Sequence, residues 1–114
     1  MAAALAAVAY AAAPATATGH VQTSNGASSV NFYSDGEKFK VCDLAADGHS
    51  AVARVTRSDR GSTVYRVWHY KGAGGCSTYN YSMPEGTDVK YRACLGSYGN
   101  NTIWGCSVEQ DDEA

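Results

Sequence analysis

The chain has 114 residues and a formal net charge of −2, from nine Lys and Arg residues against eleven Asp and Glu residues. This length indicates a single domain that is close to the lower limit for a core without covalent support. The balanced charge gives no reason to expect a nucleic-acid partner. No apolar run long enough for a mature membrane anchor follows the first residues, so we also expect no membrane anchor.

Residues 1–17 have the composition of an export signal. They are almost all Ala and close on Ala15-Thr16-Ala17, a small-x-small cleavage pattern, so we predict a signal peptide cleaved after Ala17. Such a signal normally opens with Lys or Arg, but the first basic residue is Lys38, which leaves a truncated signal with an upstream start as an alternative. A second alternative is an Ala-rich helix of the folded domain.

The remaining chain reads as a series of short strands. Turn signals rich in Gly, Asp and Asn recur about every dozen residues, and segments rich in Val, Tyr, Thr, Phe and Trp lie between them. We predict an all-β fold, a seven-stranded antiparallel immunoglobulin-like sandwich with two disulfides. The predicted strands are 28–33, 37–43, 49–56, 63–70, 76–82, 87–95 and 102–108. They form a domain over 28–108, with a flexible segment at 18–27 and a frayed acidic tail at 109–114.

Alternation gives several strands one apolar and one polar face. In the strand 37–43, Phe39 and Val41 point opposite to Cys42. In the strand 87–95, the apolar face carries Val89, Tyr91, Ala93 and Leu95, and the polar face carries Asp88, Lys90, Arg92 and Cys94. Cys76 falls on the polar face of 76–82, so three of the four cysteines lie on polar faces.

The four cysteines, Cys42, Cys76, Cys94 and Cys106, indicate a disulfide framework in an exported protein. In an immunoglobulin-like sandwich the second and fifth strands are neighbours, and so are the sixth and seventh. We therefore predict Cys42 with Cys76 and Cys94 with Cys106. Pairing of Cys76 with Cys94 remains the alternative if the fifth and sixth strands form a hairpin. Zinc binding is disfavoured because no CxxC or CxxH spacing occurs.

No catalytic set is visible in the sequence. The three histidines, His20, His49 and His69, have no metal spacing, and no nucleophile motif is present. Asp43, Asp47 and Gly48 suggest a calcium loop only weakly, because the alternating oxygen ligands and the terminal Glu are absent, and we expect a structural Asp-Gly turn instead. We therefore predict a protein without enzymatic activity, metal or cofactor.

Trp104 is the first candidate binding residue. If Cys94 and Cys106 pair on the outer face, alternation places Trp104 there beside Lys90 and Arg92, an arrangement typical of interaction hot spots. Alternatively the strand bulges at Gly105 and Trp104 enters the core. We favour burial, because large aromatic side chains supply much of a small domain's core.

The second candidate is the triplet Trp68-His69-Tyr70, which leads through a glycine-rich turn into Cys76. This run resembles the exposed Trp-Arg-Tyr hairpin of the tendamistat family of secreted α-amylase inhibitors, with His69 at the Arg position. The resemblance implies that Trp68, His69 and Tyr70 enter the active site of a hydrolase. The alternative is that Trp68 packs in the core.

A broader similarity covers residues 36–104. Its motifs are Gly36-Glu37-Lys38-Phe39, the run from Ala46 to Ala53, Pro84-Glu85-Gly86-Thr87, Ala93-Cys94-Leu95-Gly96 and Ile103-Trp104. These are similar to small secreted actinomycete proteins, which implies an exported β-sandwich.

Together these features predict a secreted, monomeric, non-enzymatic binding module. The expected partner is an extracellular protein or a cell-surface polymer. The alternative function is inhibition of an extracellular hydrolase such as α-amylase.

Overall fold

The structure, a computed structural model, describes residues 17–61 and 63–114. The predicted signal peptide lies outside the described residues except for Ala17. The described chain forms nine strands and one 3-10 turn. These are β1 (Gly19–Gln22), β2 (Ser28–Tyr33), β3 (Lys38–Asp43), β4 (Ser50–Arg57), η1 (Ser58–Arg60), β5 (Val64–His69), β6 (Cys76–Asn80), β7 (Asp88–Ser97), β8 (Thr102–Trp104) and β9 (Gln110–Glu113).

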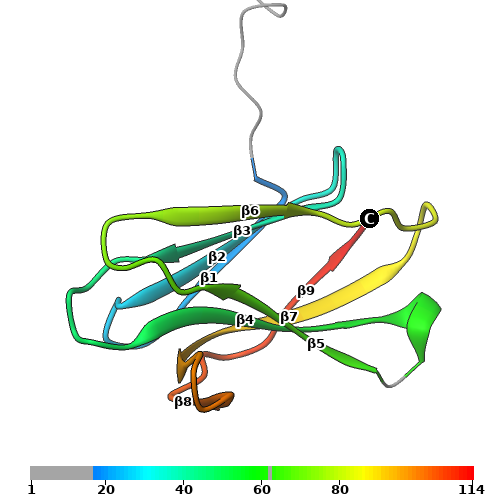
Figure 1. Ribbon diagram of the computed structural model, residues 1–114. Helices are drawn as coiled ribbons and strands as arrows, with labels where there is room; N and C mark the ends of the chain where they lie inside the picture. The colour runs from blue at the N-terminus through cyan, green and yellow to red at the C-terminus, as the bar shows by residue number, and fades with distance from the viewer. Residues whose placement is uncertain (1–16, 62) are drawn as a thin grey trace, which may run out of the picture.

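The strands form two antiparallel sheets packed face to face, which confirms the predicted sandwich (Figure 1). The first sheet, sheet A, has the order β1-β2-β3-β6, and the second, sheet B, has the order β5-β4-β7. The far edge of β7 pairs with β8 near Leu95 and with β9 near Lys90. Six of the seven predicted strands are observed within two residues of their expected ends, and two further strands lie at the ends of the chain.

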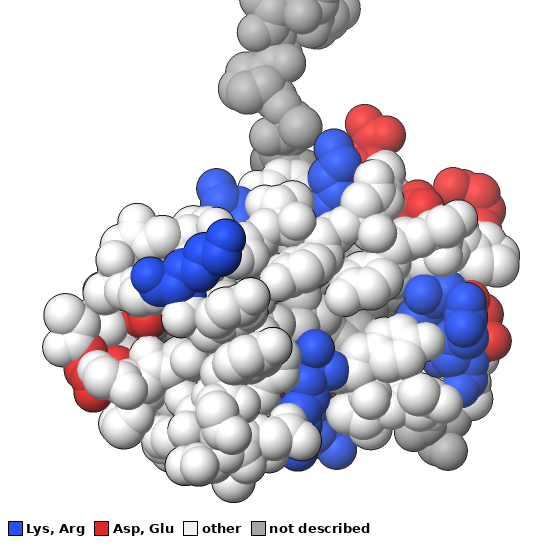
Figure 2. Space-filling model, in the orientation of Figure 1, with Lys and Arg blue, Asp and Glu red and all other residues white. Residues whose placement is uncertain are grey.

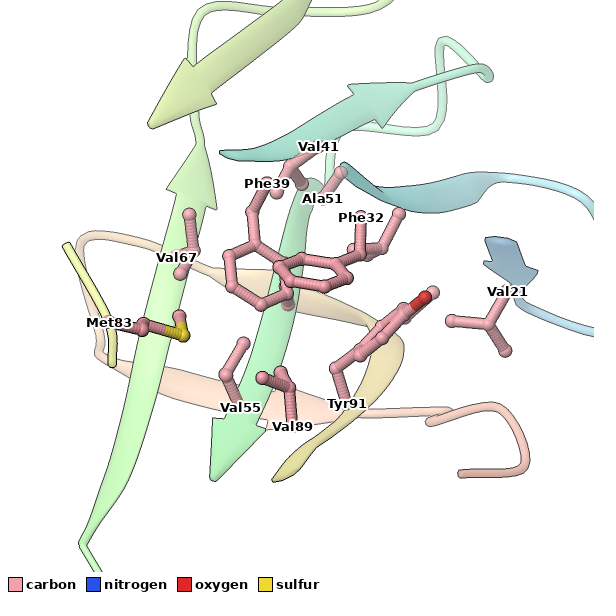
Figure 3. Close-up of a cluster of buried hydrophobic side chains, with 13 residues drawn as sticks. Val21, Phe32, Phe39, Val41, Ala51, Val55, Val67, Met83, Val89 and Tyr91 are labelled. Carbon is pink, nitrogen blue, oxygen red and sulfur yellow. The ribbon is translucent and has the colours of Figure 1, made fainter. Parts of the chain in front are cut away.

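The core lies between the two sheets and is centred on three aromatic rings (Figure 3). Phe32 and Phe39 come from sheet A, with ring centroids 4.9 Å apart. Tyr91 of sheet B meets the Phe39 ring edge-on at 5.5 Å. All three side chains are fully buried, and each contributes roughly 1.5 to 3 kcal/mol of transfer free energy. The faces that alternation predicted as apolar are therefore the faces that pack.

The C-terminal residues form a strand, so the prediction of a frayed acidic tail at 109–114 is wrong. In β9, Asp112 points inward and accepts a 2.6 Å hydrogen bond from the Tyr91 hydroxyl. Asp111 points outward and accepts one from Lys90, also at 2.6 Å. Successive carboxylates of β9 thus accept hydrogen bonds on opposite faces of the sheet, from the Tyr91 phenol inside and the Lys90 ammonium group outside, and both donors belong to β7.

The N-terminal segment 18–27 is also ordered, contrary to the prediction of a flexible segment. β1 pairs with β2 in register from Gly19 opposite Phe32 to Gln22 opposite Ser29. Val21 is buried in the core, and Thr23 organises the following turn by accepting hydrogen bonds from the amides of Ala27 and Ser28. One apolar side chain and one turn are enough to hold this short strand at the sheet edge.

Both predicted disulfides are present. Cys42 and Cys76 are directly opposite each other on β3 and β6. Cys94 on β7 bonds Cys106, which follows β8. Each bridge lies within one sheet and on its outer face, because the core residues Val41 and Ala93 precede Cys42 and Cys94 and point the opposite way. The alternative pairing of Cys76 with Cys94 is excluded, since Cys76 is bonded to Cys42 and Cys94 to Cys106.

Burial raises the pKa of Tyr91, and the Asp112 carboxylate raises it further, so the phenol stays protonated and donates to Asp112. We expect Tyr91→Phe to lower the free energy of unfolding by about 1.5 to 3 kcal/mol, the net value of a hydrogen bond to a charged group. Urea unfolding measures this loss. Tyr70→Phe is the matched control, because within the described residues the Tyr70 hydroxyl makes no side-chain hydrogen bond. Equal losses from the two variants would contradict the assignment.

Candidate functional site

The turn between β7 and β8 folds back across the outer face of sheet B. Tyr98 and Asn101 of this turn contact Trp68 and Arg66 on β5, although β4 lies between β5 and β7 in the sheet. Figure 1 shows β8 and its turn below the lower sheet. These contacts, together with that of the Trp68 ring with Gly96 of β7, pass over the outer face of β4. This explains why Val52 and Cys94, which face outward, are fully buried.

Three aromatic side chains meet at the edge of this turn and define an aromatic cluster of Trp68, Tyr70 and Tyr98. The rings of Tyr70 and Tyr98 are stacked, with centroids 4.2 Å apart and an interplanar angle of 13°. Trp68 meets Tyr98 edge-on at 5.4 Å and is half-buried. Tyr70 and Tyr98 are each 50% exposed. The cluster thus presents two stacked phenol rings to solvent on a base formed by Trp68.

Gly96 gives the cluster its close packing. A Cβ atom at this position would lie 2.8 Å from the Trp68 ring and 2.7 Å from the carbonyl oxygen of Thr102. The absence of a side chain lets the indole lie directly against the β7 backbone. Arg66 then ties the turn to β5 through hydrogen bonds of 2.7 and 3.0 Å from Nη1 to the carbonyl and side-chain oxygens of Asn101. The exposed rings are therefore held on a rigid support.

Trp104 lies neither beside the predicted cations nor in the core. The strand register places Trp104 opposite Leu95, whereas Cys106 bonds Cys94, so one extra residue must be accommodated between them. Gly105 is that residue and has a φ of 61°. The bulge turns Trp104 away from the face that carries Cys94. The favoured prediction of burial is wrong, because Trp104 is 40% exposed and rests edge-on against His49 at 4.9 Å.

Lys90 and Arg92 lie on the outer face of sheet B, where their charges are already engaged. Lys90 forms ion pairs with Asp111 at 2.6 Å and with Asp88 at 3.3 Å, and these carboxylates raise its pKa. Arg92 donates to the carbonyl oxygen of Ser107 and lies 3.9 Å from Glu109. These cations hold the C-terminal segment, and the alternative in which they surround Trp104 is also wrong.

The predicted triplet is divided by strand alternation. Trp68 and Tyr70 belong to the aromatic cluster, but His69 points inward and is 3% exposed. Its ring nitrogens contact the Ser77 hydroxyl at 2.8 Å and the Gly72 carbonyl oxygen at 2.9 Å. His69 therefore supports the glycine-rich turn and is no part of a contact surface.

A second surface, which the sequence did not indicate, is a hollow of about 500 Å³ on the open side of the sandwich. We call it the cationic hollow. Its lining residues are Arg57, Arg60, Val64, Tyr65, Arg66 and Tyr81. Figure 2 shows this side: basic side chains lie at the right, where η1 is found in Figure 1, and at the lower centre, with uncharged surface between them. The only early signal was three arginines within ten residues around one turn.

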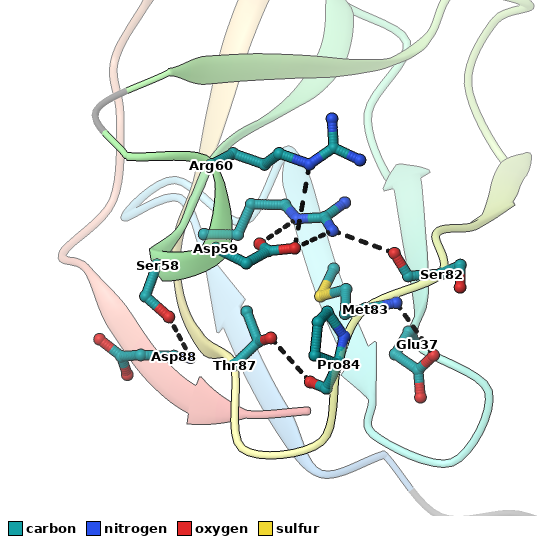
Figure 4. A network of polar contacts seen from close by, with 10 residues as sticks. Glu37, Ser58, Asp59, Arg60, Ser82, Met83, Pro84, Thr87 and Asp88 are labelled. Atoms are coloured by element: carbon teal, nitrogen blue, oxygen red, sulfur yellow. Dashed lines mark hydrogen bonds and ion pairs between the residues drawn. The ribbon is translucent and has the colours of Figure 1, made fainter.

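Arg57 lines the cationic hollow, and Figure 4 labels its two hydrogen-bond partners, Asp59 and Ser82. Its Nε and Nη2 donate to the two carboxylate oxygens of Asp59 at 2.7 and 2.6 Å, and Nη2 also donates to the carbonyl oxygen of Ser82 at 3.0 Å. The hydrogen bonds lower the pKa of Asp59 and raise that of Arg57, so both groups stay charged near neutral pH. This pair joins η1 to the segment after β6, and both of these segments contribute residues to the lining of the hollow.

Comparisons of the chain with protein-family models, curated proteins and solved structures find no match. Within residues 17–61 and 63–114 no helix is long and apolar enough to cross a membrane. The same part of the chain gathers no three His, Cys, Asp or Glu side chains that could hold a metal ion. The site must therefore be interpreted from its own geometry.

The two tryptophan side chains differ in solvent exposure, and acrylamide quenching of their fluorescence measures this difference. Trp68→Phe leaves Trp104 as the fluorophore, and Trp104→Phe leaves Trp68. We expect the fluorescence of Trp104 to be quenched more strongly, because Trp68 lies under Tyr98. Adding Tyr98→Ala to the Trp104→Phe variant should increase quenching of Trp68. Stronger quenching of Trp68 than of Trp104 in the single variants would contradict this geometry.

Proposed function

We propose that the protein is a secreted, monomeric binding module without enzymatic activity, which contacts its partner through the aromatic cluster. Two disulfides support an oxidising, extracellular environment. The observation that carries the proposal is the exposed stack of Tyr70 and Tyr98 on Trp68. Exposed Tyr and Trp side chains offer a large contact area at a low cost in conformational entropy, and are enriched at binding hot spots.

The support beneath the cluster favours binding over a purely structural role. A structural aromatic side chain is normally covered, whereas Tyr70 and Tyr98 are half exposed and held in place from below. The Cys94–Cys106 disulfide and the hydrogen bonds of Arg66 fix the turn before any partner arrives. Such preorganisation reduces the entropy that is lost on binding. The proposed partner is an extracellular protein or a cell-surface polymer.

Photocrosslinking tests this proposal. A photoreactive phenylalanine analogue replaces Tyr98 in one variant and Thr78 in a matched control, where Thr78 is an exposed residue on the outer face of sheet A. Both variants are irradiated with the culture supernatant and the cell-surface fraction of the producing organism. We expect a discrete crosslinked product from position 98 that is at least several-fold more abundant than that from position 78. Equal yields from the two positions would argue against the aromatic cluster as the contact surface.

Inhibition of an extracellular hydrolase is the second candidate function. It is favoured by the position of Trp68 and Tyr70, which share the outward face at one end of the edge strand β5. The similarity to the tendamistat triplet extends to these two positions only, since His69 is buried.

A panel of α-amylases, other glycosidases and proteases tests this alternative. We expect an inhibited enzyme at micromolar protein, and weaker inhibition by Tyr70→Ser, because the exposed ring would enter the active site. Tyr33→Ser, on the outer face of sheet A, is the control. Full activity of every enzyme in the panel would end the inhibitor hypothesis.

A further inference from the structure

The cationic hollow has an excess of positive charge. Three guanidinium groups line it, from Arg57, Arg60 and Arg66. Among the described residues the only carboxylate in contact with any of them is that of Asp59, which lies 2.6 Å from Arg57 and 3.9 Å from Arg60. The Arg60 side chain is 59% exposed, and Arg66 is also exposed. An anionic group that enters the hollow therefore meets two accessible cations.

Arg57 adds a buried donor. Its side chain is only 4% exposed, and its Nε and Nη2 atoms are used by Asp59 and Ser82. Within residues 17–61 and 63–114, Nη1 donates no hydrogen bond, although Arg57 lines the hollow. Guanidinium groups bind carboxylates through parallel hydrogen bonds with high geometric specificity. The hollow thus holds a fixed donor with remaining hydrogen-bonding capacity.

Tyrosine rings form the other wall of the hollow and continue beyond it. The ring centroids of Tyr65 and Tyr81 are 6.3 Å apart, with an interplanar angle of 22°. The ring of Tyr79 continues the row, with its centroid 6.4 Å from that of Tyr81. Burial raises the pKa of Tyr81, so its hydroxyl remains a neutral hydrogen-bond donor. The three rings are partly buried against the core, and Arg57 lies over the Tyr65 ring at 5.9 Å from its centroid. Their remaining exposed surface adds apolar area beside the arginines. This surface matches the C–H faces of successive sugar rings better than it matches a flexible acidic side chain.

We propose that the cationic hollow binds the carboxylate-bearing rings of an acidic polysaccharide. The guanidinium groups of Arg60 and Arg66 and Nη1 of Arg57 receive the carboxylate, and the rings of Tyr65 and Tyr81 pack against the sugar. The hollow faces the open side between β5 and the segment after β6, whereas the aromatic cluster lies on the outer face of sheet B. The two surfaces share Arg66, which lines the hollow and also donates from Nη1 to Asn101. The location of the hollow site is therefore tested at Arg60 and Tyr65, which are not part of the aromatic cluster.

Titration calorimetry with oligogalacturonate tests the ligand class. The matched ligand is its methyl ester, which keeps the rings and removes the negative charges, and poly-L-glutamate keeps the charges without rings. At physiological ionic strength, where long-range attraction is screened, we expect binding of oligogalacturonate and at least about tenfold weaker binding of both other ligands. Absence of binding to oligogalacturonate overturns the proposal. Equal affinity for poly-L-glutamate also overturns it, in favour of an acidic protein partner.

Paired arginine variants test the location. Arg60→Gln should weaken oligogalacturonate binding about tenfold. Lys40→Gln removes the same charge from the outer face of sheet A, away from the hollow, and should leave affinity unchanged. Tyr65→Leu should weaken binding while the charge is retained. An equal effect of Arg60→Gln and Lys40→Gln would show general charge attraction and overturn the assignment. Crosslinking from Tyr98 is unaffected by any of these outcomes, so the two proposals fail separately.

Discussion

The contact of Phe32 and Phe39 with Tyr91 is the interaction on which the structure depends. It joins the centres of the two sheets and decides which face of β2, β3 and β7 is inside. Because side chains alternate along a strand, this choice sends Cys42, Cys94 and Lys90 outward. The Tyr91 hydroxyl extends the same constraint to Asp112 and so brings β9 into sheet B. One buried tyrosine thereby orders both the core and the C-terminus.

The disulfides act on the outer faces and stabilise different parts of the molecule. The Cys42–Cys76 bridge closes a sequence separation of 34 residues between strands that are distant along the chain. The Cys94–Cys106 bridge closes 12 residues and secures the chain directly after β8. By the chain-entropy relation these loops contribute roughly 4 and roughly 3 kcal/mol. The second bridge also supports the aromatic cluster, because it closes the loop that carries Tyr98 against Trp68.

Both proposed binding surfaces use the edge strand β5. An edge strand has one side without a neighbour in its sheet, so its side chains are accessible from the face and from the open side of the sandwich. Trp68 extends onto the outer face and supports the aromatic cluster, whereas Tyr65 reaches the cationic hollow. Arg66 connects the two, since it lines the hollow and holds Asn101. The edge position of β5 and the alternation of its side chains together explain how the six residues of this strand contribute to both the aromatic cluster and the cationic hollow.

The sequence by itself determined the features that depend on local periodicity. Alternation predicted the inner faces of β3 and β7 and the outward cysteines, and the strand order of a sandwich predicted the disulfide partners. The tertiary structure decided what depends on contacts between distant segments. Asp112 became part of a strand because Tyr91 offered a buried donor, and Trp104 turned away from Cys94 because Gly105 absorbed an extra residue. The aromatic cluster forms where the β7–β8 turn contacts β5, and the cationic hollow forms where the segment after β6 lies beside β5. Contacts between segments so far apart in the sequence cannot be predicted from a local pattern.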